Sequence, residues 1–413
     1  MMKYLVWAIA CCSIPAMAQT SLTLENCYQL AQKNYPLIKQ RELITKAGSY
    51  TVANAAKGYL PQLTFTGQAT YQSQVVEIAF PGAPQLSKDQ YKVQAEVSQT
   101  LFDGGNVHYQ KELSRANTAI QQQQLEVNLY NVKDRISQLF FGILLIDEQL
   151  RQNQLRREDI ASGAHKTAGA VNNGTSLRSH LDELKAELLN ADQLRIQLNA
   201  NRTAYLQMLA LFINQPLDER TVLIKPEQVN LSPEIRRPEL ALYDYQQRSF
   251  TIREKQLKVN YLPKISAFVQ GSYGRPTLNF VGNDFGFYGL GGIRFNWALG
   301  SLYTNKNSKQ LLHISRQDVE VQKETFLFNT RLTMTSQQAQ AAQYNDLIQK
   351  DQEIIDLRSS VKKAAMAQLE NGVITSHDYI SQVNAENQAR LALALHDIQL
   401  LQIQYNHKNT SGN

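Results

Sequence analysis

The stretch GYLPQLTFTGQATYQSQVV, residues 58–76, alternates polar and apolar side chains. Amides and hydroxyls occupy the even positions from Gln62 to Gln74, while Leu63, Phe65 and small residues occupy odd positions. Alternate side chains of a β-strand point to opposite faces of the sheet. The stretch therefore predicts a β-strand with one polar and one apolar face.

Three further segments repeat this alternation: residues 91–101, 264–273 and 285–297. Strands of about ten residues, when tilted, are long enough to cross the apolar core of a bilayer. Four strands cannot close a barrel, and open sheet edges are not tolerated in lipid. The sheet must therefore pack on helices, or several chains must pool their strands. A soluble sheet with one face on a core is the alternative, but sparse charge and aromatic apolar faces favour pooled strands.

The chain shows two weakly similar halves. Pro36 and Pro238 are 202 residues apart, and so are Pro61 and Pro263. We predict a first repeat over residues 19–231 and a second over residues 232–413, each in the order helix, β-hairpin, long helix, tip, helix. Pro61 and Pro263 are the expected helix-to-strand breaks, because proline ends a helix and is tolerated at the first residue of a strand. The proline-rich residues 214–239 are the expected linker, lying against the helices.

Two very long helices are predicted, from Gly105 to about Ala170 and from about Thr304 to Leu369. Each has about 65 residues and would be about 100 Å long, which calls for coiled-coil packing. The returning helix after Gly174 carries an apolar stripe that Arg195 and Arg202 interrupt; these arginines are expected to snorkel or to line a polar interior. Glutamine-rich polar faces suggest a helical wall with water on both sides.

The first 18 residues read as a secretory signal peptide. A basic start at Lys3 precedes a short apolar stretch and the small-x-small site Ala16-Met17-Ala18. Cleavage before Cys11 or Cys12, giving a lipoprotein, is the alternative. Cleavage after Ala18 leaves Cys27 as the single cysteine, so no intrachain disulfide is possible. No later window has 18 consecutive apolar residues, so a membrane crossing would use strands.

The order and spacing of several short motifs resemble the TolC-like outer-membrane efflux family over essentially the whole mature chain. The motifs are NYPLI (34–38) and RRPEL (236–240) at helix starts, YLP (59–61 and 261–263), LFDGG (101–105) and NGVITSHDYISQVNA (371–385). The resemblance implies an α+β membrane protein in which a long α-helical coiled-coil barrel continues into a transmembrane β-barrel, with four strands per protomer. It implies a homotrimer in the outer membrane that extends through the periplasm.

The resemblance also implies site residues. Family members carry an aspartate six residues after the second tip glycine, and three copies ring the periplasmic constriction; Asp378 matches this position. Gly174 and Gly372 match the tip turns that dock the adaptor. The family's other tip acids are Ser381 and His180 here, and its gate latch residues fall at Leu369 and Ile374, so the latch does not carry over. Read from the residues alone, Asp378 is equally an acid in the first turn of a helix capped by Ser376.

The expected function is that of the outer-membrane channel of a tripartite efflux or type I secretion system. Its partners would be a periplasmic adaptor (membrane fusion) protein, an inner-membrane pump and outer-membrane lipid. The alternative is a trimeric coiled-coil envelope scaffold or adhesin that transports nothing. No cofactor, metal or catalytic site is predicted, because no histidine spacing fits a metal motif and Cys27 fits core packing. Without a run of basic residues, nucleic acid is not an expected partner.

Overall fold

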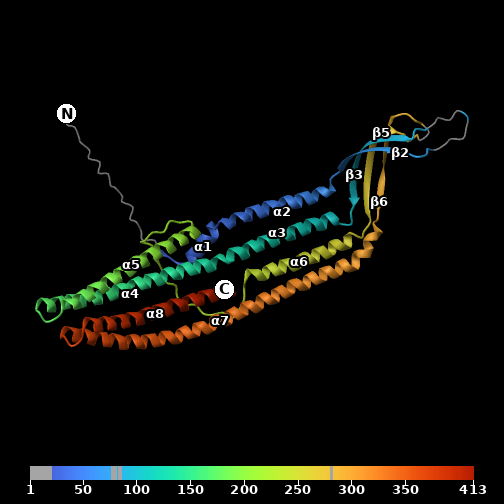
Figure 1. Cartoon of the computed structure of the whole chain (residues 1–413). Coiled ribbons are helices and arrows are strands. Elements are labelled where there is room, and N and C mark those ends of the chain that lie inside the picture. Colours follow the sequence, from blue (N-terminus) through green and yellow to red (C-terminus); the bar gives the residue numbers. More distant parts are fainter. Residues whose placement is uncertain (1–20, 76–80, 82–85, 280–281) are drawn as a thin grey trace, which may run out of the picture. The chain divides into compact units, whose positions relative to one another are not determined.

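The computed structural model describes residues 21–75, 81, 86–279 and 282–413, and the predicted signal peptide lies outside them. The chain divides into two compact units, each drawing on both halves of the sequence (Figure 1). The strand unit comprises residues 39–127 and 238–328. The tip unit comprises the rest of the described chain, namely residues up to 38, 128–237 and 329–413. The two sequence repeats remain a prediction.

The strand unit contains all four predicted strands in one antiparallel sheet. The sheet order is β2-β3-β5-β6, so β3 and β5, which come from different halves of the chain, pair at its centre. The edges of the sheet are therefore β2 and β6. The first strand ends three residues earlier than predicted. The strands are β2 (Gln62–Tyr71), β3 (Asp89–Phe102), β5 (Lys264–Arg275) and β6 (Gly286–Asn296).

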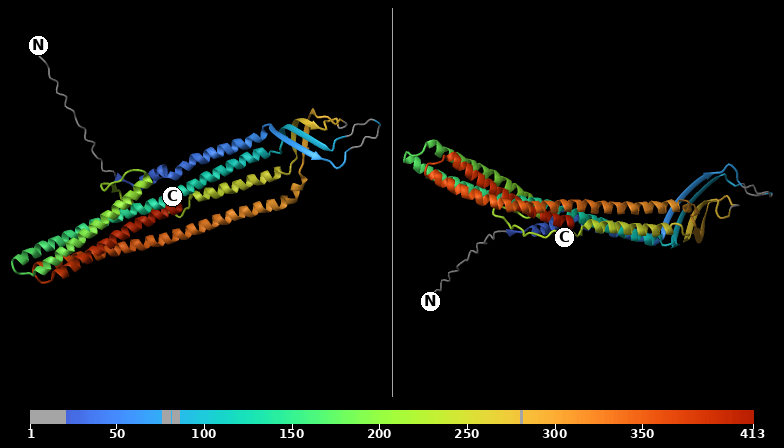
Figure 2. Two further views of the ribbon diagram at one scale, coloured as in Figure 1. Left: turned by 45° about the horizontal axis from the view of Figure 1, so that its top comes forward. Right: turned by 90° about the horizontal axis from the view of Figure 1, so that it is seen from below.

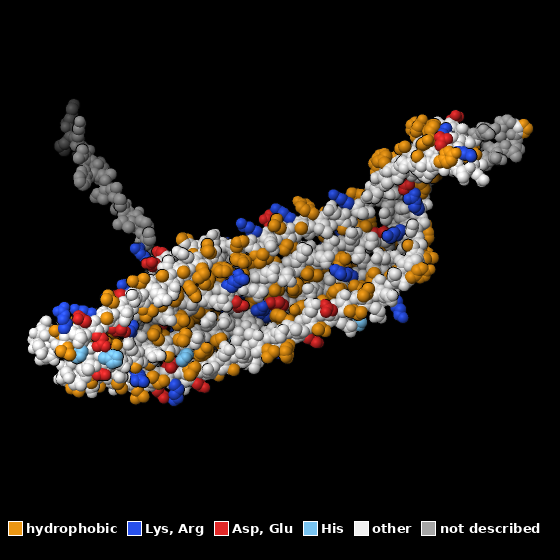
Figure 3. All heavy atoms as spheres, viewed as in Figure 1, with side chains coloured by type: hydrophobic (Ala, Val, Ile, Leu, Met, Phe, Trp, Pro, Cys, Tyr) orange, Lys and Arg blue, Asp and Glu red, His pale blue; other side chains and the backbone are white. Residues whose placement is uncertain are grey.

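The register of the sheet separates its two faces as the alternation predicts. Leu63 lies opposite Val97, Val97 opposite Val269, and Val269 opposite Gly291. Residues directly opposite each other project to the same side of a sheet, so one face carries most of the apolar side chains of the four strands. Every residue of β2 is exposed. The sheet is thus not folded back onto helices, and hydrophobic side chains remain visible along it (Figure 3).

The helices of the strand unit meet the strands at the predicted breaks. Pro61 and Pro263 each stand directly before a strand, β2 and β5 respectively. In the LFDGG motif, the carboxylate of Asp103 accepts hydrogen bonds from the Gly105 and Val107 amides, which begins α3. The helices are α2 (Gln40–Ala56), α3 (Asn106–Tyr130), α6 (Pro238–Val259) and the first part of α7 (Leu302–Glu370), with short 3-10 turns at Lys57–Tyr59 and Leu299–Ser301. A further 3-10 turn, Pro36–Lys39, lies at the sequence boundary between the two units.

The first long helix differs from its prediction because it is divided in two at Asn131. The backbone of Asn131 keeps right-handed helical angles, so the break is slight and no proline or glycine marks it. The second long helix, α7, runs unbroken for 69 residues. Besides the second part of α7, the tip unit contains α1 (Leu24–Asn34), α4 (Val132–Asn172), α5 (Arg178–Ile213) and α8 (Ser376–Ser411). None of the described helices combines the length and hydropathy needed to span a membrane.

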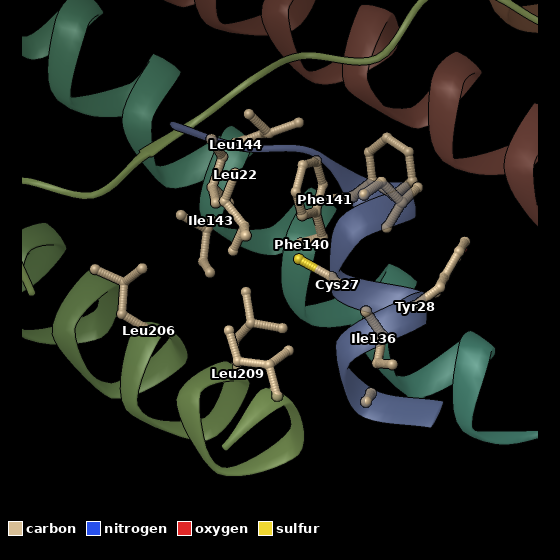
Figure 4. Close-up of a cluster of buried hydrophobic side chains, with 14 of the residues drawn as sticks. Leu22, Cys27, Tyr28, Ile136, Phe140, Phe141, Ile143, Leu144, Leu206 and Leu209 are labelled. Carbon is tan, nitrogen blue, oxygen red and sulfur yellow. The ribbon is translucent and has the colours of Figure 1, made fainter. Parts of the chain in front are cut away.

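The larger core of the tip unit lies where α1, α4 and α5 meet. Cys27 is fully buried there, and Figure 4 shows its sulfur among side chains that include Phe140, Ile136 and Leu209. Burial raises the pKa of the Cys27 thiol to about 12, so this residue packs as a small apolar side chain. This confirms the prediction for Cys27.

The linker lies along the tip unit, as predicted, and one unpredicted element fixes it. Residues Val222–Leu223 form β4, which pairs in parallel with β1 (Ser21–Leu22). Arg202 on α5 donates hydrogen bonds to Asp147 at 2.5 Å and to the Glu219 and Thr221 carbonyls. Arg202 therefore ties the linker to α4 and α5, where we expected it to snorkel or to line a polar interior.

Candidate functional site

Two helical hairpins of the tip unit end in turns of the same construction. Helices α4 and α5 run side by side to the first turn in both views of Figure 2. At this turn the Gly174 amide bonds to the Val171 carbonyl and the Thr175 amide to the Ala170 carbonyl. This pair of bonds is the Schellman motif, in which the residue after the helix adopts left-handed geometry. Gly174 has φ 73°, which glycine adopts without strain.

The turn between α7 and α8 repeats this pattern. The Gly372 amide bonds to the Leu369 carbonyl, the Val373 amide bonds to the Gln368 carbonyl, and Gly372 has φ 68°. A Cβ atom at either tip glycine would meet no atom within 4 Å, so backbone geometry and not crowding selects glycine here. Both predicted tip glycines thus form turns; their role in docking a partner stays a prediction.

A polar groove of about 920 Å³ separates the two turns. Lys166 on α4 forms an ion pair with Glu370 on α7 across it. The Thr167 hydroxyl faces this groove and is buried, with no hydrogen-bond partner among the described residues. Figure 3 shows basic, acidic and histidine side chains gathered at this end of the unit. The groove is lined by Lys166, Thr167, Gly169, Ala170, Asn173, Thr175, Ser176, Leu177, His180, Leu369, Glu370, Asn371, Gly372 and Ile374.

Asp378 caps the start of α8. Its carboxylate accepts hydrogen bonds from the Thr375 amide at 3.0 Å and the Thr375 hydroxyl at 2.7 Å. The Asp378 amide in turn donates to the Thr375 hydroxyl at 3.2 Å, which completes a capping box. The hydrogen bonds from Thr375 lower the pKa of Asp378. The capping interpretation is therefore confirmed for an exposed carboxylate, while its place in a constriction ring stays a prediction.

The expected cap, Ser376, has another role, so that detail of the prediction was wrong. Ser376 is buried, and its hydroxyl donates to Glu183 Oε2 on α5 at 2.5 Å. The other oxygen of Glu183 lies 3.2 Å from Nδ1 of the exposed His377. Glu183 therefore joins the start of α8 to the α4–α5 hairpin.

The positions at which the family latch is absent are occupied by packing residues. Leu369 and Ile374 both pack against a buried cluster, the tip cluster, which draws on α4, α5, α7 and α8. Tyr379 is the largest residue of this cluster, and its hydroxyl donates to the Asp159 carbonyl at 3.0 Å. The tip cluster consists of Ile160, Ala164, Leu184, Ala365, Tyr379, Ile380 and Val383.

A buried charge network lies beside the tip cluster. Lys362 on α7 contacts Asp159 on α4 at 2.7 Å and Glu386 on α8 at 2.8 Å, and Arg390 contacts Glu386 at 2.7 Å. Burial by itself lowers the pKa of Lys362, but the hydrogen bonds that its ammonium group donates to Asp159 and Glu386 outweigh burial and raise this pKa. Burial likewise opposes ionisation of Glu386, and its two cationic partners hold its pKa below the ordinary value. The network thus keeps its charges and bonds three helices together.

Sequence reasoning found the tip glycines and Asp378 but not the groove pair or the charge network. Lys166 and Glu370 lie on different helical hairpins and far apart in the sequence, and nothing in their local sequence marks them as partners. The same holds for Lys362 and Asp159, which are 203 residues apart. Pro61 and Pro263 lie in the strand unit and do not belong to this site. Within the described ranges, no group of histidine, cysteine and acidic side chains could hold a metal ion.

Comparisons with known proteins place these features in context. Residues 27–215 match the model of the outer membrane efflux protein family. No match was found among curated protein sequences.

Solved outer-membrane channels share the fold. The structure of CusC has a TM-score of 0.68 at 14% identity, over 93% of this chain and 91% of that one. The CmeC outer membrane channel of Campylobacter jejuni has a TM-score of 0.62 at 14% identity, over 94% of this chain and 85% of that one. The open state of the MtrE outer membrane channel of Neisseria gonorrhoeae has a TM-score of 0.62 at 13% identity, over 94% of this chain and 89% of that one.

Proposed function

From the match of residues 27–215 to the model of the outer membrane efflux protein family, we propose that this chain is the outer-membrane channel of a tripartite efflux or type I secretion system. Three copies form a tunnel that passes substrates from an inner-membrane pump and a periplasmic adaptor to the exterior. The channel sits in the outer membrane and extends into the periplasm. It performs no enzymatic chemistry and needs no cofactor.

The two-faced sheet with open edges is the observation that carries this proposal. An apolar face with exposed Phe65, Phe287 and Ile293 suits contact with lipid, and the opposite face carries amides and hydroxyls. Within the described chain β2 and β6 are each paired on one side only. Lipid does not tolerate such edges, so β2 of one copy pairs with β6 of the next until the ring closes. Three copies of the four-stranded sheet give a twelve-stranded barrel.

An exposed apolar stripe on α7 supports contact between copies in the helical part of the strand unit. Leu311, Ile314, Val321 and Phe328 are all exposed, and their spacing of three and seven residues places them on one helix face. Such a stripe on a long helix is the seam of a coiled coil and requires a partner helix. We assign that partner to a neighbouring copy.

The tip unit supplies the periplasmic entrance. We assign adaptor docking to the groove between the Gly174 and Gly372 turns, where the buried Thr167 hydroxyl has no hydrogen-bond partner in the described part of the chain. Asp378 from three copies rings the constriction, where carboxylates near a narrow axis attract cations. In place of the missing latch, packing of Leu369 and Ile374 on the tip cluster holds the entrance closed.

A matched pair of arginine variants tests the channel against the scaffold or adhesin alternative. Phe65 and Thr66 are neighbours in β2, both exposed, and project to opposite faces. If the apolar face contacts lipid, Phe65→Arg costs about 2–4 kcal/mol of insertion near the bilayer midplane, whereas Thr66→Arg on the water-filled side is tolerated. We expect stepwise conductance in planar bilayers from the wild-type and Thr66→Arg proteins and little from Phe65→Arg.

The scaffold alternative gives different results. A non-transporting trimer tolerates both arginines equally and leaves the bilayer silent. An intact trimer without conductance would therefore overturn the channel assignment, whereas conductance sensitive to Phe65→Arg supports it.

A further inference from the structure

The polar face of the sheet carries more cations than anions. Lys92 and Glu96 lie on this face of β3, and Glu96 is opposite Gln270 of β5. Arg294 of β6 is opposite Ser266, and Lys264 is opposite Asn296, on the same face. Three basic side chains and one acidic side chain therefore share the face among the described strand residues. The apolar face holds Asp89 and Arg275, which form an ion pair with each other at the ends of their strands.

The single acid of this face is neutralised in place. Arg294 binds Glu96 through both guanidinium nitrogens, at 2.8 and 3.1 Å, which is the bidentate geometry of a strong pair. The guanidinium also lies 4.4 Å from the centre of the Phe268 ring, which fixes its orientation. Gln94 donates to both Glu96 and Gln270. This cluster contributes no net charge to the face.

The two lysines supply the excess charge. Neither Lys92 nor Lys264 forms an ion pair with any side chain in the described part of the chain. One protomer thus presents two more cations than anions on the face that, under the proposed function, lines the water path. A narrow path with low-dielectric walls focuses the field of such groups and raises the local concentration of anions.

We propose that the strand section of the channel favours anions, and that its exported solutes include anionic molecules. This inference rests on the proposed function, because it places the polar face in the lumen. Lys92 and Lys264 are the residues that set the preference, and the Arg294–Glu96 pair is its neutral background. The carboxylates of Asp378 lie in the tip unit and are identical in every variant used below, so differences between variants report on the strands.

Reversal potentials across planar bilayers in a potassium chloride gradient test the inference. We expect Lys92→Gln and Lys264→Gln each to shift the reversal potential toward potassium selectivity, and the double variant to shift it further. Lys92→Glu shifts it further than Lys92→Gln. The control is Gln68→Asn, a neutral change on the same face, which leaves the reversal potential unchanged.

The outcomes separate the two claims. Channels that conduct, but whose reversal potential is the same in the wild-type, double and Lys92→Glu proteins, overturn the anion preference and leave the channel standing. A wild-type protein that never conducts overturns both. Conductance of each variant shows that it has folded and inserted, so a loss of selectivity cannot be confused with a loss of structure.

Discussion

Lys362 on α7 and Glu386 on α8 form a 2.8 Å ion pair in which the Glu386 side chain is 3% exposed. Asp159 on α4 contacts the same ammonium group, so a single lysine joins both hairpins of the tip unit. Charges this deeply buried must be matched, because an unpaired one keeps the full cost of losing its water. The pair therefore controls how firmly the hairpins hold together.

Lys362→Met should destabilise the tip unit by about 3 kcal/mol. This value is at the lower end of the range for a broken buried ion pair, because Glu386 keeps its ion pair with Arg390. Urea unfolding of the detergent-solubilised protein, followed by circular dichroism, measures the effect. The matched control is Lys350→Met on the same helix, which removes an exposed pair with Glu353 and should change stability by less than about 0.5 kcal/mol. Equal effects of the two substitutions would contradict the role of the network.

The tip glycines should be sensitive to any side chain. At Gly372 and Gly174 the positive φ makes Gly→Ala cost about 1–2 kcal/mol, although a Cβ would meet open space. Gly169 is the control, because it lies inside α4 with equally open space around a Cβ. Gly169→Ala should stabilise the helix by about 0.5–1 kcal/mol. Thermal unfolding of the three variants compares them, and a neutral Gly372→Ala would show that the turn can relax.

Local patterns predicted the strands and the tips because the signals there are local. Alternation in residues 58–76 fixes which face each side chain takes, and glycine at position 174 or 372 marks a left-handed turn within a few residues. The break at Asn131 was not predicted, because its backbone stays helical and no proline or glycine marks it in the sequence.

Pairings between distant segments could not be predicted in the same way. The contact of β3 with β5, the β1–β4 pair and the Lys362–Asp159 pair each join residues far apart in the chain. Each depends on which distant segments pack together, and local sequence patterns do not show this. Sequence reasoning therefore located the tip turns but missed the charges that hold the hairpins together.

The Cys27 thiol should be inert in the folded protein. It is fully buried, and burial raises its pKa to about 12, so almost no reactive thiolate exists at neutral pH. Maleimide should label Cys27 after denaturation and not before, as followed by mass spectrometry. Asn371→Cys, at the exposed second tip, provides a thiol that should react at once in the same molecule. Labelling of both sites at similar rates in native buffer would argue against the packed core around α1.

The cap formed by Asp378 should give the start of α8 a dependence on acid pH. Hydrogen bonds from Thr375 lower the pKa of Asp378 below its ordinary value of 3.8. A carboxylate with a depressed pKa stabilises the folded state fully above the unfolded value, and this contribution is lost as the pH falls through the folded value. Asp378→Asn removes the titration, so the stability difference between the wild-type and variant proteins should be constant at neutral pH and shrink below about pH 3.8.

Unfolding midpoints of the two proteins, measured from pH 7 down to pH 2.5, check this prediction. Asp356→Asn on α7 makes the same acid-to-amide exchange outside the capping box, and it is the comparison that shows whether the effect belongs to the cap. If instead the wild-type protein gains stability relative to Asp378→Asn as the pH falls, the Asp378 carboxylate is destabilising in the folded protein.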